Sequence, residues 1–224
     1  MIRNIIHNTN PNIFHAQGKP FYCPLWNRIK TLSNTEKVIP NNLDIITYNN
    51  GFAHPNKLPG SFEESIQNKC SVLGTDISNW ENVIKIKLTI QFLESSTKDY
   101  ILACDSCDVV VYSFENLIDK FISKNCDMLY NGEFKPYPYN LNHFSYMYEK
   151  SHFKPPFQHL NTGVWMGKRE FALQFYRELS KYIEGNTCDQ KITREIYPNY
   201  PTILVDDTCT IFQTLNSVDL NILR

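Results

Sequence analysis

The chain of 224 residues is long enough to bury the core of one fairly large domain. Apolar residues make up 42% of it and aromatic residues 13%, which excludes an intrinsically disordered chain. The formal net charge of −1 provides no overall basic field for binding nucleic acid or anionic lipid. No apolar run approaches the roughly 20 residues of a membrane span, and the opening MIRNIIHNTN lacks the apolar segment of a signal peptide. We therefore expect a cytoplasmic protein.

The first half of the chain alternates short apolar runs with segments of helical periodicity. The runs that we interpret as buried strands are residues 12–15, 43–50, 71–76, 99–112 and 126–133. The helices that we predict are residues 62–70, 79–96 and 114–124. Ser61 and Glu64 are predicted to form a capping box for the first helix. Because strands that alternate with helices favour parallel pairing, we predict an α/β fold.

The second half of the chain is less regular. Residues 135–159 are rich in aromatic residues and prolines, which indicates a long surface loop. Helices are predicted at residues 169–184 and 191–197, followed by a pair of strands at residues 202–207 and 209–215.

Two aspartates, Asp105 and Asp108, follow the apolar run YILAC at its carboxyl end. Burying two carboxylates there is costly unless a cation or hydrogen-bond donors compensate their charge. That edge of an open α/β sheet is also where ligands bind. Hard oxygen ligands with this spacing suit Mg²⁺ or Mn²⁺ bound to a diphosphate. The alternative interpretation is that the aspartates cap the next segment or face solvent.

The seven cysteines are odd in number and irregular in spacing, and most of them lie in apolar stretches. We interpret them as reduced thiols that pack as small apolar side chains. Cys104 and Cys107 form a Cys-x-x-Cys motif, but the sequence holds no second cysteine or histidine pair for a zinc site. Packing is therefore favoured over zinc or redox chemistry for this motif.

Four stretches occur in one order along the chain: ILACDSCDVVVY, LNTGVWMGK, CDQKITREIY and CTIFQTLN. Together they resemble the Asp-Ser-x-Asp-Val, Leu-Asn-Ser-Gly, Asp-Asp-Gln and Ile-Phe-Gln-x-Leu-Asn patterns of one family. That family is the glycosyltransferase domain of the collagen lysyl hydroxylases, with viral and bacterial relatives. The resemblance covers most of residues 43–217 and implies a GT-A fold, which is a single Rossmann-like α/β domain with a mixed central sheet flanked by helices.

The family has a third metal ligand, a histidine in a late His-x-Asn-Gly-Pro motif. No such histidine follows CTIFQTLN here, but the opening MIRNIIHNTNPNIFHAQGKP resembles the missing piece. His15, Gln17 and Gly18 match motif positions, and Lys19 stands where the family has proline. The resemblance implies a circular permutation, in which residues 1–42 correspond to the family's C-terminal segment and residues 43–224 to its main body. The two ends of the single domain 1–224 would then lie close together. The alternative is a chance match of a short histidine loop.

The resemblance assigns roles around a metal and a nucleotide. Asp105, Asp108 and His15 would hold Mn²⁺, or Mg²⁺ in its place. Lys19 and Lys85 would add positive charge beside the diphosphate, although for Lys85 a solvated position on a helix is the favoured alternative. The residues expected to contact the UDP part of the donor are Thr47, Tyr48, Asn49, Gln17 and Gly18. Tyr48 would stack on the base, unless it is simply packed.

The remaining assignments concern the sugars. Asn161, Thr162 and Gly163 would line the donor sugar, and Gly163 would allow close approach of the backbone. Trp165 would form an acceptor platform, with core packing as the equal alternative. Asp189 and Gln190 match the Asp-Gln pair, and Asp189 would contact the sugar or act near its anomeric carbon. The expected catalytic residues are thus Asp189, Gln190 and Asn161.

The sequence departs from the family at two positions. Cys107 replaces an aromatic residue and Cys188 replaces an aspartate, which puts a base or ribose contact and the sugar specificity in doubt. The leading hypothesis is a metal-dependent hexosyltransferase that uses a UDP-sugar, with glucose or galactose favoured, and a hydroxyl acceptor on a protein or glycan. The alternatives are a nucleotide-sugar or glycan-binding module and a nucleotidyltransferase.

Overall fold

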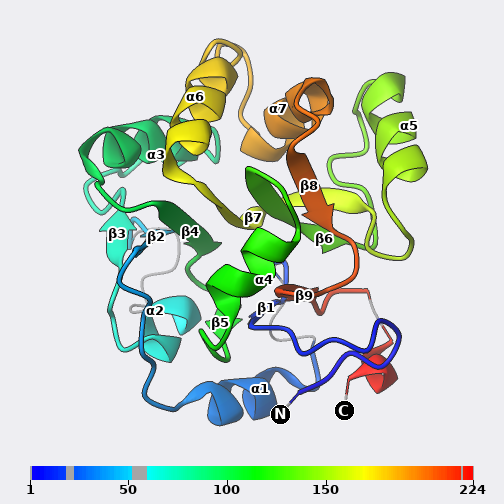
Figure 1. Ribbon diagram of the computed structural model, residues 1–224. Helices are drawn as coiled ribbons and strands as arrows, with labels where there is room; N and C mark the ends of the chain where they lie inside the picture. The colour runs from blue at the N-terminus through cyan, green and yellow to red at the C-terminus, as the bar shows by residue number, and fades with distance from the viewer. Residues whose placement is uncertain (1, 19–22, 52–59, 218, 224) are drawn as a thin grey trace.

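The computed structural model describes residues 2–18, 23–51, 60–217 and 219–223. Six strands form the central sheet: β2 (Leu43–Tyr48), β3 (Ser71–Leu73), β4 (Tyr100–Asp105), β6 (Met128–Glu133), β7 (His159–Lys168) and β8 (Ile203–Asp206). They lie in the order β3-β2-β4-β7-β6-β8 (Figure 1). β7 runs antiparallel to its neighbours β4 and β6, whereas the other pairs in the sheet are parallel. The sheet is therefore mixed, as predicted.

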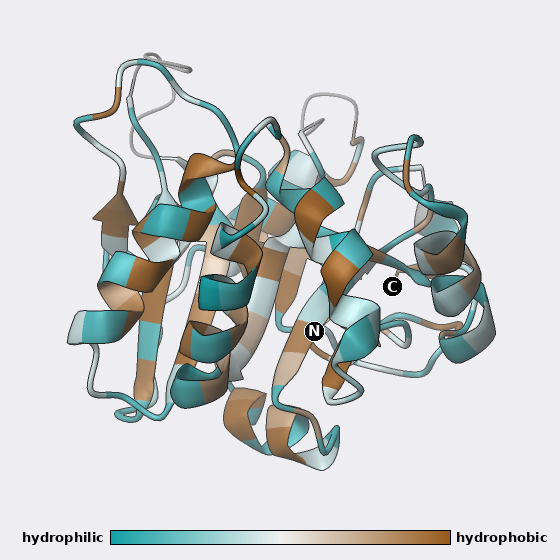
Figure 2. Cartoon of the chain, turned by 90° about the horizontal axis from the view of Figure 1, so that it is seen from above, coloured by the Kyte–Doolittle hydropathy of each residue, from teal (hydrophilic) through white to brown (hydrophobic). Residues whose placement is uncertain are grey.

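Helices cover both faces of the central sheet. They are α2 (Ser61–Ser65), α3 (Ile84–Ser95), α4 (Leu117–Ser123), α6 (Arg169–Ser180) and α7 (Asp189–Ile196). One face packs against α3, α6 and α7, and the opposite face against α2 and α4. In β4, Ile101 and Ala103 point to the first face and Leu102 and Cys104 to the second, as the two-residue period of a strand requires. The helices show alternating polar and apolar bands around a mostly apolar sheet (Figure 2). This arrangement confirms the predicted α/β class with a mixed central sheet flanked by helices.

A second, three-stranded sheet in the order β5-β1-β9 brings the N-terminal segment against the body of the chain. Its strands are β1 (Ile13–His15), β5 (Val109–Val111) and β9 (Phe212–Thr214). β1 pairs antiparallel with β5 and parallel with β9. The described ends also meet, because Asn4 bridges Leu223 and the Ile5 amide donates to the Ile222 carbonyl over 2.8 Å, next to η4 (Leu220–Ile222).

The predicted run 99–112 forms two strands instead of one. β4 and β5 belong to different sheets, because the chain turns at residues 106–108. Strands form within both predicted ranges 202–207 and 209–215, but β8 and β9 lie in different sheets and do not pair with each other. Here the physical reason is Asp206, whose carboxylate accepts hydrogen bonds from the amides of Thr210, Ile211 and Phe212 and so turns the chain.

Several helix predictions need correction. The helix predicted at 62–70 is the short α2, and Gly60 is its N-cap. Ser61 instead donates its hydroxyl hydrogen to the Val109 carbonyl, so no capping box forms. The loop predicted at 135–159 contains α5 (His143–His152), where the Asn142 side chain accepts the Ser145 amide as an N-cap. The helix α1 (Trp26–Ser33) was not predicted, and it packs on the outer side of the small sheet. α7 is followed by η3 (Tyr197–Asn199).

None of the helices in the described ranges combines the length and apolar character that crossing a membrane requires. The cytoplasmic location stays a prediction.

Candidate metal centre and active site

A cavity of about 470 Å³ opens where β4 and β6 end and where the loop after β1 begins. Most of the site residues predicted from the sequence line it: His15, Gln17, Gly18, Lys85, Asp105, Asp108, Asn161, Thr162, Gly163, Asp189 and Gln190. The further lining residues include Glu133, Lys135, Tyr137 and Tyr139, which were not singled out from the sequence. Lys19 lies outside the described residues. The fold thus gathers side chains from distant stretches around one space.

Asp105, Asp108 and His15 form a three-residue group that could hold a metal ion. One ligand atom from each residue lies within 4.8 Å of the other two. Asp105 ends β4, and Asp108 lies just before β5, which pairs with β1 so that His15 lies opposite Val109. Two carboxylates and one imidazole suit Mn²⁺, which tolerates mixed oxygen and nitrogen ligation.

The loop that carries His15 is held directly on the turn that carries Asp108. The Ala16 amide donates to the Asp108 carbonyl over 2.8 Å, and the Gly18 amide donates to Asp108 Oδ2. Because these contacts join the loop to both the backbone and the side chain of Asp108, the imidazole of His15 is kept beside the two aspartates. The N-terminal segment is therefore part of the site.

The imidazole of His15 is oriented for a further partner. Asn131 Nδ2 lies 3.1 Å from His15 Nδ1, whereas the buried Nε2 has no hydrogen-bond partner in the described structure. Nε2 lies 3.4 Å from Asp108 Oδ2. Burial disfavours the charged imidazole, but the carboxylates of Asp108 and Asp105 raise the pKa of His15 overall. A divalent cation among these carboxylates would take the place of the proton on Nε2, because a histidine ligates a metal through a neutral ring nitrogen.

Gly163 lies against this group and leaves no room for a side chain. A Cβ atom there would approach His15 Cε1 to 2.4 Å and Asp105 Oδ2 to 2.8 Å. The φ angle of Gly163 is not in the left-handed region, so the glycine is needed for this close approach and not for an unusual backbone conformation.

We therefore expect Gly163→Ala to displace two metal ligands while the protein stays folded. Affinity for Mn²⁺, measured by isothermal titration calorimetry, should fall about 10- to 100-fold, the usual range for a disturbed ligand geometry. Gly185→Ala is the matched control, because Gly185 adopts φ of +74° but a Cβ added there would meet no atom within 4 Å. Equal affinities in the two variants would contradict this role for Gly163.

Lys85 points into the cavity, so the solvated alternative is wrong. It lies in the first turn of α3, and its Nζ donates to Asp105 Oδ1 over 2.5 Å. Burial alone would lower the pKa of Lys85, but Asp105 and Asp189 raise it overall, so the side chain stays charged. Asp189, the first residue of α7, is itself buried, and burial raises the pKa of its carboxyl. These side chains place one fixed positive charge beside the metal group.

Glu133 is the functional candidate that the sequence analysis missed. It ends β6, is 6% exposed, and accepts hydrogen bonds from three amide side chains. Gln17 and Asn161 donate to its Oε2 over 2.9 and 3.1 Å, and Gln190 donates to its Oε1 over 2.7 Å. Burial raises the pKa of Glu133 to about 7. Its signal in the sequence was an acidic residue at the end of an apolar run, at the same sheet edge as Asp105.

Asn161 and Gln190 were predicted to be catalytic, but their polar atoms are directed to other protein groups. Asn161 accepts the Gly163 amide besides donating to Glu133. Gln190 accepts the Thr162 amide and donates to the Tyr137 carbonyl as well as to Glu133. In this structure both residues position Glu133 and the cavity wall.

Of the five residues expected to contact the UDP part of the donor, Gln17 and Gly18 line the cavity, whereas Thr47, Tyr48 and Asn49 do not. Thr47 is fully buried and donates to the Cys104 carbonyl over 2.8 Å, and the Tyr48 hydroxyl lies 2.6 Å from Thr89 Oγ1. Asn49 donates to Glu63 and Ser106. The strand end where they lie therefore supports the neighbouring metal turn through buried hydrogen bonds.

Trp165 is 1% exposed and packs between Tyr130 and Tyr176, so it offers no face to a ligand. The core-packing alternative holds, because Trp165 lies opposite Ala103 and Tyr130 in the middle of the sheet. Cys104 is likewise fully buried among core residues, in agreement with the packing interpretation of its motif.

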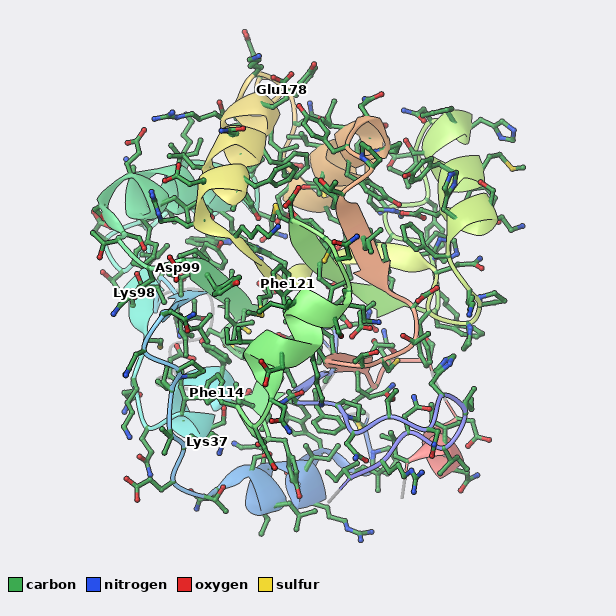
Figure 3. All side chains as sticks on the ribbon, viewed as in Figure 1. Lys37, Lys98, Asp99, Phe114, Phe121 and Glu178 are labelled. Carbon is green, nitrogen blue, oxygen red and sulfur yellow. The ribbon has the colours of Figure 1, made fainter. Side chains whose placement is uncertain are left out.

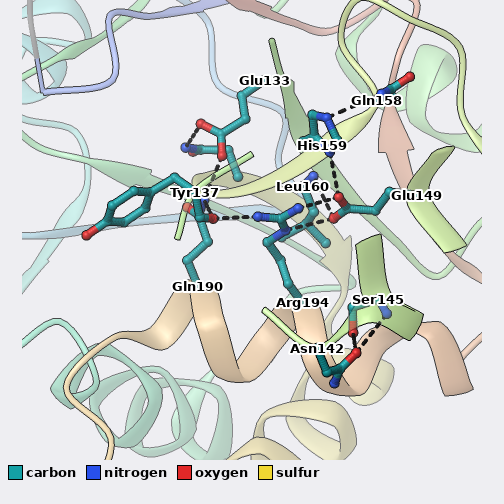
Figure 4. Close-up of polar contacts among 11 residues, drawn as sticks. Glu133, Tyr137, Asn142, Ser145, Glu149, Gln158, His159, Leu160, Gln190 and Arg194 are labelled. Carbon is teal, nitrogen blue, oxygen red and sulfur yellow. Dashed lines mark hydrogen bonds and ion pairs between the residues drawn. The ribbon is translucent and has the colours of Figure 1, made fainter. Parts of the chain in front are cut away.

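A buried charge cluster lies behind the cavity wall (Figure 4). Arg194 and Glu149 are both 0% exposed and form two hydrogen bonds, one of 2.8 Å from Nε to Oε1. His159 Nδ1 lies 2.7 Å from Glu149 Oε2. Burial would raise the pKa of Glu149, but the hydrogen bonds from His159 and Arg194 lower it overall, so the carboxylate stays ionised. Arg194 Nη1 also donates to the Tyr137 carbonyl over 2.7 Å.

Removing the cation of this cluster should cost much stability. We expect Arg194→Ala to lower the free energy of unfolding by about 3–5 kcal/mol, because the buried Glu149 is left without its partner. Arg177→Ala, which breaks an exposed pair with Glu94, should cost about 1 kcal/mol or less. Urea unfolding measures both free energies. A similarly small loss of unfolding free energy in the two variants would show that water compensates the charge of Glu149.

Comparisons with known proteins add little to this geometry. No family model matches the chain, and no curated protein matches it. A similar solved structure is the apo form of mouse xyloside xylosyltransferase 1, at 10% sequence identity and a TM-score of 0.39. The match covers 92% of this chain and 83% of that chain. Similarity at this level carries no argument about function.

Proposed function

We propose that this chain is a metal-dependent glycosyltransferase of the GT-A type, which transfers a hexose from a UDP-sugar to a hydroxyl acceptor. The observation that carries the proposal is the group of Asp105, Asp108 and His15 at the carboxyl edge of the sheet, facing Glu133 across one cavity. Paired carboxylates at that edge suit a diphosphate held through a cation. A carboxyl group with a pKa of about 7 suits proton transfer.

The chemistry follows from these positions. A bound divalent cation would offset the negative charge that builds on the diphosphate leaving group. Lys85, next to Asp105, adds a second positive charge there. The acceptor hydroxyl gives its proton to the Glu133 carboxylate while its oxygen forms a bond to C1 of the sugar. The bond between C1 and the diphosphate oxygen breaks, and its electron pair leaves with UDP. Asp189 contacts the sugar hydroxyls.

We further propose that the chain is a circularly permuted relative of the collagen lysyl hydroxylase glycosyltransferases. The proposal is supported by the position of β1 between β5 and β9, which carries His15 to the two aspartates. It is also supported by the bridge between Asn4 and Leu223, since a permutation requires neighbouring ends.

The function is tested by measuring UDP release from a panel of UDP-hexoses with Mn²⁺. We expect hydrolysis of at least one donor, UDP-glucose or UDP-galactose first, and its loss when EDTA removes the metal. UDP binding without release from any donor would favour a binding module instead. If neither release nor UDP binding occurs, the proposed function is wrong.

A further inference from the structure

Two exposed tyrosines lie on the rim of the cavity. Tyr137 is 56% exposed and Tyr139 is 77% exposed, and both line the same space as Glu133 and Asp189. Large aromatic side chains that remain this exposed next to a catalytic cavity are candidates for ligand contact. They are distinct from the metal group, which lies on the segments around β1, β4 and β5.

The backbone at Tyr137 is firmly held. The Tyr137 carbonyl accepts hydrogen bonds of 2.7 Å from both Gln190 Nε2 and Arg194 Nη1, and Arg194 is anchored in turn by the buried Glu149. The Tyr137 ring points away from this cluster (Figure 4). Pro136 and Pro138 further restrict the segment. A buried ion pair is a costly way to gain stability, but it fixes a segment in one position.

The same rim carries a positive charge. Lys135 lines the cavity, and no carboxylate of the described residues forms an ion pair with it. The same cavity is also lined by the carboxylates of Asp105, Asp108, Glu133 and Asp189. The charge of Lys135 therefore does not decide between a basic and an acidic ligand, and the ligand class follows from the two tyrosines.

We propose that Tyr137 and Tyr139 form an acceptor subsite for a carbohydrate. This inference rests on the proposed function and specifies its acceptor. A sugar ring presents an apolar face of C–H groups with hydroxyls at its edge. A tyrosine matches both, with an apolar ring and a polar hydroxyl. Because tyrosine has few rotatable bonds and this backbone is anchored, little conformational entropy is lost on binding.

The experiment uses the whole chain with Mn²⁺ and the donor that it hydrolyses. The probes are methyl glycosides of glucose, galactose, mannose, N-acetylglucosamine and glucuronic acid, with serine and hydroxylysine peptides for comparison. The measured quantity is the ratio of UDP release with the probe to release without it. Tyr137→Ala and Tyr139→Ala are compared with Tyr182→Ala, an exposed tyrosine that does not line the cavity. Saturation-transfer NMR measures glycoside binding independently of turnover.

At least one glycoside is expected to stimulate release in the wild type. The stimulation ratio should fall tenfold or more in Tyr137→Ala and Tyr139→Ala, recover in the phenylalanine variants, and stay at the wild-type value in Tyr182→Ala. The inference is overturned if the alanine variants keep the wild-type ratio. It is also overturned if only peptides stimulate release, or if the donor is hydrolysed and no glycoside stimulates or binds. If no donor is hydrolysed, the proposed function is contradicted instead. Glycoside binding measured by NMR then tests the tyrosine subsite independently of the proposed function.

Discussion

Replacing Asp108 with asparagine is expected to lower Mn²⁺-dependent UDP release by about 10³-fold, because a metal contributes several kcal/mol of transition-state stabilisation. Asp108 faces the imidazole of His15 and accepts the Gly18 amide. An asparagine oxygen can still accept that amide, so the loop should stay in place while the charge is lost. Burial would raise the pKa of Asp108, but the His15 imidazole and the Gly18 amide lower it overall, which keeps the carboxyl ionised as a metal ligand must be.

Two further variants complete this measurement. Asp127→Asn removes a surface carboxylate that pairs with Lys168, and it should leave both Mn²⁺ affinity and UDP release unchanged. His15→Ala should reduce Mn²⁺ affinity together with UDP release. If His15→Ala keeps full activity while Asp108→Asn loses it, the N-terminal histidine is not a ligand and the permutation proposal fails.

The second large effect concerns Glu133. Glu133→Gln should lower kcat/KM by about 10²- to 10⁴-fold, the range for loss of a general base. In the wild type, kcat/KM should rise about tenfold per pH unit up to the Glu133 pKa of about 7 and then level off, because only the carboxylate accepts a proton. The variant should lack this rise. A rise that persists in the variant with the same midpoint would assign the base to another group.

Stability measurements separate catalysis from folding. The folded-state pKa of Glu133 lies above its ordinary value of 4.5, so ionisation costs stability, and this cost develops as the pH rises from about 4.5 to about 7. Glu133→Gln carries no such charge and does not bear this cost. As far as this charge is concerned, its free energy of unfolding at pH 8 should be no lower than that of the wild type. Glu178→Gln, at the outer end of α6 and far from the cavity (Figure 3), is the control for an acidic residue outside the site.

Local patterns in the sequence were sufficient for much of the fold. The alternation of apolar residues around Ile101–Cys104 and the helical spacing in residues 79–96 report which side of an element is buried, and that burial is set by near neighbours. The aspartates after YILAC were also readable, because a polar pair at a strand end is a local signal. The helix α5 was missed because the aromatic and proline-rich composition around it outweighed the Asn142 cap.

The composition of the site was decided mainly by tertiary contacts. Glu133 accepts the Gln17 amide across 116 positions of sequence, and the pairing of β6 with β7 brings Asn161 beside it. The aromatic residues exposed at the cavity are Tyr137 and Tyr139 instead of the predicted Trp165, and tertiary contacts are again the reason. Packing in the sheet buries Trp165, whereas Arg194 holds the Tyr137 backbone at the cavity. The α/β class, the acidic turn and the match of the histidine loop to a family motif could all be predicted from local patterns. The contact between the histidine loop and the turn that carries Asp108 depended on packing between distant segments, and so did the pKa of Glu133. No local pattern encodes the energies of such packing.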